Sequence, residues 1–176
     1  MNTHDEEHRV VIESITEAMF QLLEKKKLSE ITITDLVTRA GVARTTYYRN
    51  FQTKEEVIER FIDMIFEQFE AEYPIENIRQ RYTEAHIQNI FRYVVRYHHR
   101  LELIHKSELS AVFLNRLNSF LLGIAEKDAT LTPQEKLHVY FLAGAEYNFI
   151  FNWYLQYPGR NREEIIKYLA RQPAMC

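Results

Sequence analysis

Apolar residues recur every three or four positions along most of the chain, which is the spacing of one face of an α-helix. The first such stripe covers residues 5–26 and ends in the run Lys25-Lys26-Lys27. Cations stabilise the C-terminal end of a helix because the helix dipole is negative there. The pattern therefore predicts a first helix over residues 5–26, followed by a short connector over residues 28–31.

Capping and turn residues set the limits of the next two helices. Thr32 followed by Asp35 is typical of an N-cap with an acidic residue in the first turn. Gly41 suits the left-handed conformation that commonly ends a helix, because glycine has no Cβ to clash. These signals predict one helix over residues 33–40 and a shorter one over residues 43–51.

The rest of the chain continues with helical periodicity. Thr53 and Glu56 form a capping-box pattern that predicts a fourth helix, ending before Pro74. Pro133 is placed as a first-turn proline, and Pro158-Gly159 breaks the helix that it opens. The sequence shows no repeat, low-complexity tract or strand pattern, so an all-α fold is predicted. The helices expected beyond Pro74 cover residues 82–99, 101–105 (a short helix or a turn), 109–124, 133–157 and 162–171.

Residues 32–51 combine a helix, a short turn with glycine and a second helix, which is the helix-turn-helix arrangement of many DNA-binding proteins. On the second helix Tyr47 and Phe51 are four residues apart, so they share a face and are expected to pack on the core. The opposite face carries cations, a hydroxyl and a phenol, which suit phosphates and base edges in a major groove. That face consists of Arg44, Thr45, Tyr48 and Arg49.

Over residues 8–60 the chain resembles the TetR family of one-component transcriptional regulators, and beyond them the resemblance is weak. The matching residues are Thr32-Ile33-x-Asp35-Leu36, Ala40-Gly41-Val42 and Thr46-x-Tyr48-x-x-Phe51-x-x-Lys54-Glu55. Asn50 departs from the histidine often found at its position in the family. Each polar residue alone is also consistent with a solvated charge, a helix start or a packing residue. Taken together, these polar residues occur at the spacing that the family pattern requires relative to Gly41 and to the caps at Thr32 and Thr53, which favours DNA binding.

The resemblance implies that six residues contact DNA, and the polar face of the second helix adds Arg49 as a seventh. Four of them would face bases or nearby phosphates, and Thr46 lies partly off that face. Tyr48 and Lys54 would each hold a phosphate. The predicted DNA-binding residues are Thr34, Arg44, Thr45, Thr46, Tyr48, Arg49 and Lys54.

The family resemblance also implies two domains. A helix-turn-helix DNA-binding domain would cover residues 1–53, and a C-terminal helical bundle for ligand binding and dimerisation would cover residues 54–176. The expected function is that of a DNA-binding transcriptional regulator. We expect a ligand-responsive repressor that binds a palindromic double-stranded DNA operator as a homodimer and responds to an unknown small-molecule effector. The alternative is a helical coactivator or adaptor of the same fold that no longer binds operator DNA.

A homodimer is expected because one short recognition helix reads too few base pairs. The small residues Ala143-Gly144-Ala145 lie among bulky aromatic residues in segment 134–156, where another backbone can come close. The resemblance implies that the last two long helices of each subunit form a four-helix bundle between subunits. Alternatively, these aromatic residues belong to the core of their own chain. The predicted interface residues are Phe141, Gly144, Phe151, Tyr154 and Ile165.

The chain contains 11 Tyr and 11 Phe, which is more than a small core needs. The resemblance places a ligand pocket inside the bundle formed by the fourth to eighth helices. Plain core packing is the alternative for any single candidate. The candidates are Tyr82, His86, Phe91, Tyr93, Tyr97, Phe113, Phe120, Tyr147 and Trp153.

The formal net charge of −3 does not by itself indicate a nucleic-acid binder, but the charge is unevenly distributed. A basic segment near the N-terminus is attached to an acidic remainder, which fits local contact with phosphates. Two acidic residues, Glu30 and Asp35, lie within that segment. Its basic residues are Lys25, Lys26, Lys27, Arg39, Arg44, Arg49 and Lys54.

Cysteine content and hydropathy indicate the cellular compartment in which the protein is expected. The single cysteine, Cys176, is the last residue, so an intrachain disulfide is excluded and a reducing compartment is compatible. The polar, acidic N-terminus is unlike a signal peptide, and no apolar run approaches the ~20 residues that span a membrane. We therefore expect a cytoplasmic protein with no membrane partner.

Enzymatic and metal-binding roles are not predicted. The sequence has no glycine-rich phosphate loop, nucleophile elbow or zinc-protease helix motif. The adjacent His98 and His99 point about 100° apart on a helix and cannot chelate one ion together. Neither lies four residues from His86 or His105, and no cysteine is near. No cofactor and no metal are expected.

Overall fold

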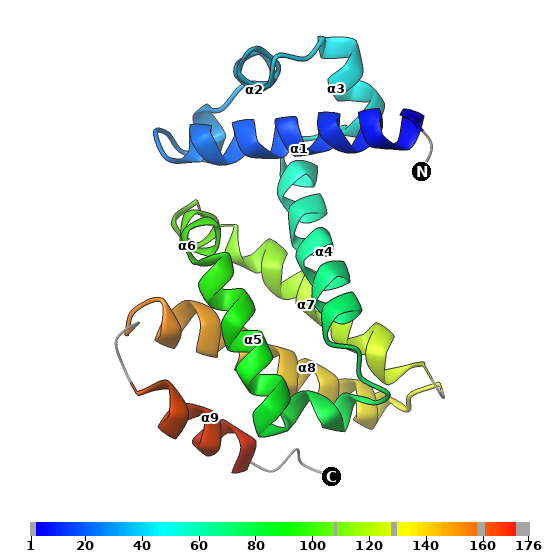
Figure 1. Ribbon diagram of the computed structural model, residues 1–176, viewed down its shortest axis with the longest axis vertical. Coiled ribbons are helices and arrows are strands. Elements are labelled where there is room, and N and C mark those ends of the chain that lie inside the picture. Colours follow the sequence, from blue (N-terminus) through cyan, green and yellow to red (C-terminus); the bar gives the residue numbers. More distant parts are fainter. Residues whose placement is uncertain (1–2, 108, 128–129, 158–160, 172–176) are drawn as a thin grey trace.

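The computed structural model describes residues 3–107, 109–127, 130–157 and 161–171. Within these ranges the chain is helical and forms no strand, which confirms the predicted all-α fold. Helices α1 (Thr3–Leu23), α2 (Ile33–Ala40) and α3 (Arg44–Asn50) form one end of the molecule (Figure 1). From there α4 (Glu55–Glu72) runs to α5 (Glu84–Arg96), α6 (His98–Lys106), α7 (Ser110–Ala125), α8 (Pro133–Tyr147) and α9 (Arg162–Arg171).

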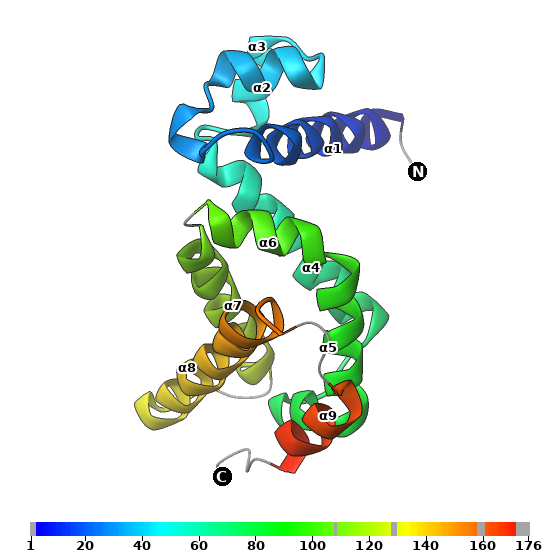
Figure 2. The ribbon, with the colours of Figure 1, turned by 90° about the vertical axis from the view of Figure 1, so that its left-hand side faces the viewer.

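Three shorter elements connect the helices. They are the 3₁₀ helices η1 (Leu28–Glu30) and η2 (Ile78–Tyr82) and the π-helical segment η3 (Asn148–Tyr154). Seen from the side, α9 lies at the opposite end of the molecule from α1, α2 and α3 (Figure 2). No helix among the described residues has the length and apolar character that crossing a membrane requires. Two features of the sequence, Pro158-Gly159 and Cys176, lie outside the described residues.

The first helix is shorter than its apolar stripe predicts. It ends at Leu23, so the three lysines follow the helix and do not belong to its last turn. One of them has a partner in another helix, because Lys26 Nζ lies 2.8 Å from Asp35 Oδ2 in α2. The prediction that these cations stabilise the C-terminus of α1 is therefore wrong, and Lys26 instead ties the connector to α2.

The predicted helix over residues 82–99 is divided into two elements. Thr83 caps α5, since its Oγ1 accepts a hydrogen bond of 3.3 Å from the backbone N–H of His86. At the other end Tyr97 leaves helical geometry, with φ −104° and ψ 12°, and α6 begins at the next residue. The missed signal is this Thr83 cap, which places Tyr82 in η2 before the helix.

The predicted helix over residues 133–157 begins as expected and then changes its winding. Pro133 occupies the first turn, and Thr132 and Glu135 form a reciprocal capping box. After Tyr147 the chain continues as the π-helical segment η3, where one extra residue enters each turn. The prediction of one continuous α-helix is therefore wrong in its last part.

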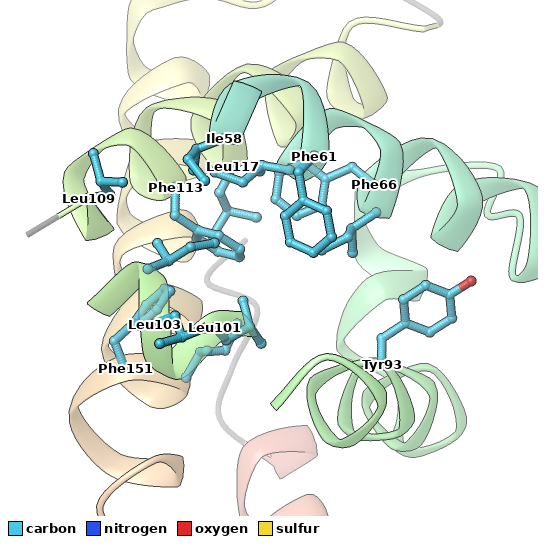
Figure 3. Packing of buried hydrophobic residues seen from close by; sticks show 14 of the residues in the cluster. Ile58, Phe61, Phe66, Tyr93, Leu101, Leu103, Leu109, Phe113, Leu117 and Phe151 are labelled. Carbon is cyan, nitrogen blue, oxygen red and sulfur yellow. The ribbon is translucent and has the colours of Figure 1, made fainter. Parts of the chain in front are cut away.

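Helix α4 contributes to the core at both ends of the molecule. Near its start, the ring of Phe61 packs edge-on against Phe20 of α1, with centroids 4.6 Å apart. Further along, Phe66 stacks against Phe120 of α7 with centroids 4.8 Å apart. Figure 3 shows side chains of α4, α6 and α7 gathered in one apolar cluster, which is continuous along the molecule. The two ends are thus joined by packed side chains of one helix.

Two glycines provide a matched stability test. Gly41 has φ 69°, a left-handed conformation in which an added Cβ is strained, whereas Gly123 is an exposed residue of α7. Gly41→Ala is expected to lower the free energy of unfolding by about 1 kcal/mol, and Gly123→Ala to raise it by about 0.5–1 kcal/mol. Urea denaturation measures both. Equal effects of the two substitutions would contradict the assigned turn conformation.

Candidate nucleic-acid interface and C-terminal cavities

The start of α2 is fixed by a reciprocal capping box. Asp35 N donates to Thr32 Oγ1 at 3.1 Å, and Thr32 N donates to Asp35 Oδ2 at 2.9 Å, as the sequence predicts. Hydrogen bonds from Lys26 and Thr32 lower the pKa of Asp35 to about 2, so its carboxylate is charged at neutral pH. The left-handed Gly41 ends α2 and turns the chain toward α3. Local interactions therefore set how α3 leaves α2.

One face of α3 is anchored in the core, as predicted. Tyr47 and Phe51 are buried, and the Tyr47 hydroxyl donates to the carbonyl oxygen of Thr53 at 2.9 Å. The fourth-helix capping box differs in part from the prediction. Thr53 Oγ1 accepts from Glu56 N as expected, but the Glu56 carboxylate accepts from the N–H of Gln52 instead of closing on Thr53. These hydrogen bonds fix the turn between the end of α3 and the start of α4.

The opposite face of α3 is polar and exposed, and one of its side chains contacts α2. Arg44 Nη1 donates to Thr34 Oγ1 of α2 at 3.3 Å, and Arg44 Nη2 donates to Tyr48 Oη at 3.1 Å. The structure therefore brings three predicted site residues together in one contact group. Tyr48 is 48% exposed, and the Arg44 guanidinium lies over its ring, 5.4 Å from the ring centroid. Thr45 and Arg49 are also exposed on this helix.

The two remaining predicted residues are less accessible. Thr46 is half-buried, in agreement with its expected position off the main face. Lys54 Nζ donates to the backbone carbonyls of Leu28 at 2.5 Å and Ile31 at 3.0 Å. Lys54 thereby connects the start of α4 to η1, a structural role that sequence did not reveal. An ammonium has three hydrogens, and one is left for a phosphate.

A cavity of about 40 Å³ lies among α4, α5, α6 and α7. Of the predicted pocket residues, Tyr93, Tyr97 and Phe113 line it. A second cavity, of about 150 Å³, lies beside α8 and is lined by Tyr82 and Phe91. The other lining residues of the second cavity are Ile87, Ile90, Phe141, Leu142, Ala145, Glu146, Phe149, Ile150 and Leu169.

The other predicted pocket residues lie outside both cavity walls. Phe120 stacks on Phe66, with ring centroids 4.8 Å apart. Tyr147 packs against Phe151, and Trp153 stacks on Phe149. His86 is buried with its ring edge-to-face against Phe69, at 5.1 Å between centroids. These contacts are those of packed side chains, and a pocket role for these four residues stays a prediction.

Sequence reasoning missed a buried ion pair between the cavities. Arg81 of η2 and Glu146 of α8 form two hydrogen bonds, Nε to Oε1 at 2.7 Å and Nη2 to Oε2 at 2.8 Å. Tyr82 Oη donates to the same carboxylate at 3.0 Å. The Arg81 side chain is 4% exposed, and its guanidinium lies over the rings of Phe69 and Phe120. Because 65 residues separate the partners, no local pattern indicates this pair.

Two of the predicted dimer-interface residues are part of the core of their own chain. Phe151 is fully buried at 0% exposure and Tyr154 is buried as well, so these two predictions are wrong. Both aromatic rings pack intramolecularly, Phe151 against Phe113 and Tyr154 against Phe91. By contrast, Phe141 is 59% exposed. Gly144 and Ile165 are partly exposed, and no side chain occupies the space around Gly144.

The buried imidazole of His86 makes stability depend on pH. Burial, reinforced by the Arg81 cation, lowers the pKa of His86 to about 4 from an ordinary 6.5. Between these values the unfolded chain binds a proton that the folded chain does not, so stability is present above pH 6.5 and falls toward pH 4. His86→Leu is expected to flatten this part of the profile, measured as urea midpoints at each pH. If the stability of wild type and of His86→Leu changes with pH in the same way, the pH dependence does not come from His86.

A helix-turn-helix with an exposed polar face on its second helix, carried by an all-helical body, is the arrangement found in helix-turn-helix DNA-binding proteins. Residues 15–61 match the family model described as bacterial regulatory proteins, tetR family. This match confirms, for residues 15–61, the resemblance to the TetR family that the sequence predicts.

Two similar proteins extend this finding. The HTH-type transcriptional regulator EthR of Mycolicibacterium smegmatis is 39% identical over 51 residues, 29% of this chain. The match spans only about a quarter of that relative's length, 24%. A crystal structure of a TetR transcriptional regulator from Rhodococcus sp. RHA1 shares the fold, with a TM-score of 0.57 and 18% identity. That likeness covers 93% of this chain and 95% of the other chain.

Proposed function

We propose that this protein is a ligand-responsive repressor that binds a palindromic operator as a homodimer. In this proposal residues 1–53 bind DNA, and residues 54–176 bind the effector and dimerise. The observation that carries the proposal is the exposed group formed by Arg44, Thr34 and Tyr48 on α2 and α3. Nothing else in the described chain covers this group, and its donors match phosphate and base-edge acceptors.

In DNA recognition, the start of α3 enters the major groove. Arg44 is at the first position of the helix, where recognition helices contact base edges. Thr45 and Arg49 flank it on the exposed side, and Thr34 approaches from α2. Tyr48 and the remaining hydrogen of Lys54 hold phosphates on either side, with Thr46 as a minor contact. Contacts with phosphates fix the register, and Arg44 contributes sequence preference.

The homodimer is proposed to form through α8 and α9. Leu137 and Phe141 of α8 are 69% and 59% exposed, and Tyr140 lies between them in the sequence. Tyr168 of α9 is a further exposed aromatic residue. Such a concentration of large apolar groups on one terminal pair of helices is typical of an interface between subunits. Gly144, one turn further along α8, leaves room for the partner's backbone.

Phe141→Glu is expected to weaken the dimer by at least about tenfold, because a carboxylate would be desolvated at the centre of the contact. Sedimentation equilibrium measures the dimer dissociation constant. Val95→Glu is the matched control, since Val95 is an exposed apolar residue on α5 away from α8. If Phe141→Glu dimerises as well as the control, the interface is elsewhere. Gly144→Arg is expected to give monomers for the same reason.

Response to a ligand is supported by the path from the cavities to α1. The first cavity is lined by Ile65 of α4 and Leu101 of α6. Both helices also contact α1, through Phe61 against Phe20 and through Arg100 Nη2 to Glu17 Oε2 at 2.7 Å. A ligand that separates α4 and α6 therefore changes the orientation of α1 and of α3. In a dimer this changes the distance between two recognition helices and lowers operator affinity.

An electrophoretic mobility shift with the DNA upstream of the protein's own gene tests the proposal. We expect a complex at low salt whose affinity falls as salt rises, because phosphate contacts release counterions. Excess unrelated duplex should not abolish it. Absence of binding at low salt would contradict the proposal and favour the adaptor alternative.

A further inference from the structure

The buried guanidinium of Arg81 has an unused hydrogen-bond donor. Two of its nitrogens are bound to Glu146, but Arg81 Nη1 has no hydrogen-bond partner although it is buried. Arg81 lines the cavity of about 40 Å³, whose other walls are almost entirely apolar. A buried donor left without a partner is costly, so a ligand that supplies an acceptor gains more here than at the surface.

The charge of this site is already balanced. Glu146 neutralises Arg81 through two hydrogen bonds, and Tyr82 donates a third to the same carboxylate. The pKa of His86 is lowered mainly by burial, which keeps this imidazole neutral beside the pair. An anionic ligand would therefore bring an uncompensated charge into an apolar interior. A neutral acceptor, such as a carbonyl or ether oxygen, satisfies Nη1 without that cost.

The neighbouring cavity has room for an apolar body. At about 150 Å³ it is the size at which an apolar cavity accommodates a single aromatic ring. Ile90, Glu146 and Ile150 line both cavities and form the wall between them. Ile90 is half-buried, and a change of its side-chain rotamer is the movement that would join the two cavities. Most of the larger cavity is lined by aromatic and aliphatic side chains.

We propose that the two cavities form one binding site for a small neutral molecule with an aromatic-sized apolar body and one hydrogen-bond acceptor. The body occupies the cavity beside α8, and the acceptor reaches Arg81 Nη1. This inference rests on the proposed ligand-responsive function and specifies the chemistry of its effector.

Three probes of similar size distinguish the recognition chemistry in isothermal titration calorimetry with the full chain. They are acetophenone, ethylbenzene and benzoate. Acetophenone is expected to bind at least about tenfold more tightly than ethylbenzene, which lacks the acceptor, since a hydrogen bond to a charged group is worth that factor or more. Benzoate is expected to bind more weakly than acetophenone. Tighter binding of benzoate, equal binding of acetophenone and ethylbenzene, or binding of neither overturns the proposal.

A double variant tests the role of the ion pair itself. Arg81→Met/Glu146→Met removes both charges and is expected to abolish the difference in affinity between acetophenone and ethylbenzene. The control, Arg116→Met/Asp63→Leu, removes another ion pair, between α7 and α4, whose members line neither cavity. It should keep the wild-type ranking. If the first double variant does not fold, Ile90→Phe, which fills the shared wall, should abolish binding of both neutral probes.

DNA binding measured in parallel distinguishes failure of the proposed ligand site from failure of the proposed DNA-binding function. A chain that binds DNA but no neutral probe contradicts the ligand inference and leaves the proposed DNA-binding function intact. A chain that binds the probes in the expected order while DNA affinity stays constant supports the site. That second result contradicts the ligand-responsive part of the proposed function.

Discussion

Arg44→Ala is expected to weaken operator binding by at least about tenfold while the protein remains folded, since one base or phosphate contact of arginine is worth about 1–3 kcal/mol. Arg44 is exposed, and its side-chain hydrogen bonds within the described ranges go to Thr34 and Tyr48, which are not buried, so its loss leaves neither as a buried group without a partner. The loss also removes the hydrogen bond that orients the Tyr48 hydroxyl. Fluorescence anisotropy with an operator duplex measures the dissociation constant.

A matched control separates this contact from a general effect of charge. Arg92 is an exposed arginine on α5, so Arg92→Ala changes the net charge equally at a distance from α3. Its effect on DNA affinity should be within about twofold, because exposed charges beyond a Debye length are screened. Tyr48→Phe should give a smaller loss than Arg44→Ala, since only the hydroxyl is removed. Equal affinities of the Arg44 and Arg92 variants would remove Arg44 from the DNA site.

Arg81→Ala is expected to lower the free energy of unfolding by about 3–5 kcal/mol, the usual cost of breaking a buried ion pair. The substitution leaves the buried Glu146 carboxylate without its bidentate partner. It also removes the guanidinium that packs over the rings of Phe69 and Phe120. Urea denaturation at pH 7 measures the change, and the folded baseline shows whether the variant retains its structure.

An exposed ion pair serves as the control for this effect. Lys136 Nζ lies 3.0 Å from Glu126 Oε1, and both side chains are substantially exposed. Lys136→Ala is expected to change the free energy of unfolding by less than about 1 kcal/mol. If Arg81→Ala costs no more than this control, the pair does not hold η2 against α8. Replacing both Arg81 and Glu146 with methionine should restore much of the lost stability, because no charge is then buried alone.

The helix-turn-helix was predictable because its determinants are local. The Thr32–Asp35 capping box, the left-handed Gly41 and the four-residue spacing of Tyr47 and Phe51 all act within one or two turns. Each is visible in the sequence as a residue type at a fixed interval. The structure confirms the resulting elements closely, including the division of α3 into a buried and an exposed face.

The C-terminal half was less predictable because its determinants are long-range. The pairing of Arg81 with Glu146 depends on how η2 meets α8, which no local spacing encodes. The burial of Phe151 and Tyr154 depends on their contacts with Phe113 of α7 and Phe91 of α5, which no local spacing encodes. Aromatic residues at helical spacing therefore indicated burial correctly, but did not distinguish the core of the chain from a dimer interface or a cavity.

The most direct test of the account is selection of binding sites from a pool of random DNA duplexes, followed by anisotropy on the enriched sequence. A homodimer with two recognition helices should select an inverted repeat whose half-site centres are separated by about one helical turn, 10–10.5 base pairs, or a multiple of it. Arg44→Ala should weaken binding to that repeat. No enrichment of any duplex, or a single half-site bound equally well by wild type and Arg44→Ala, would contradict the account.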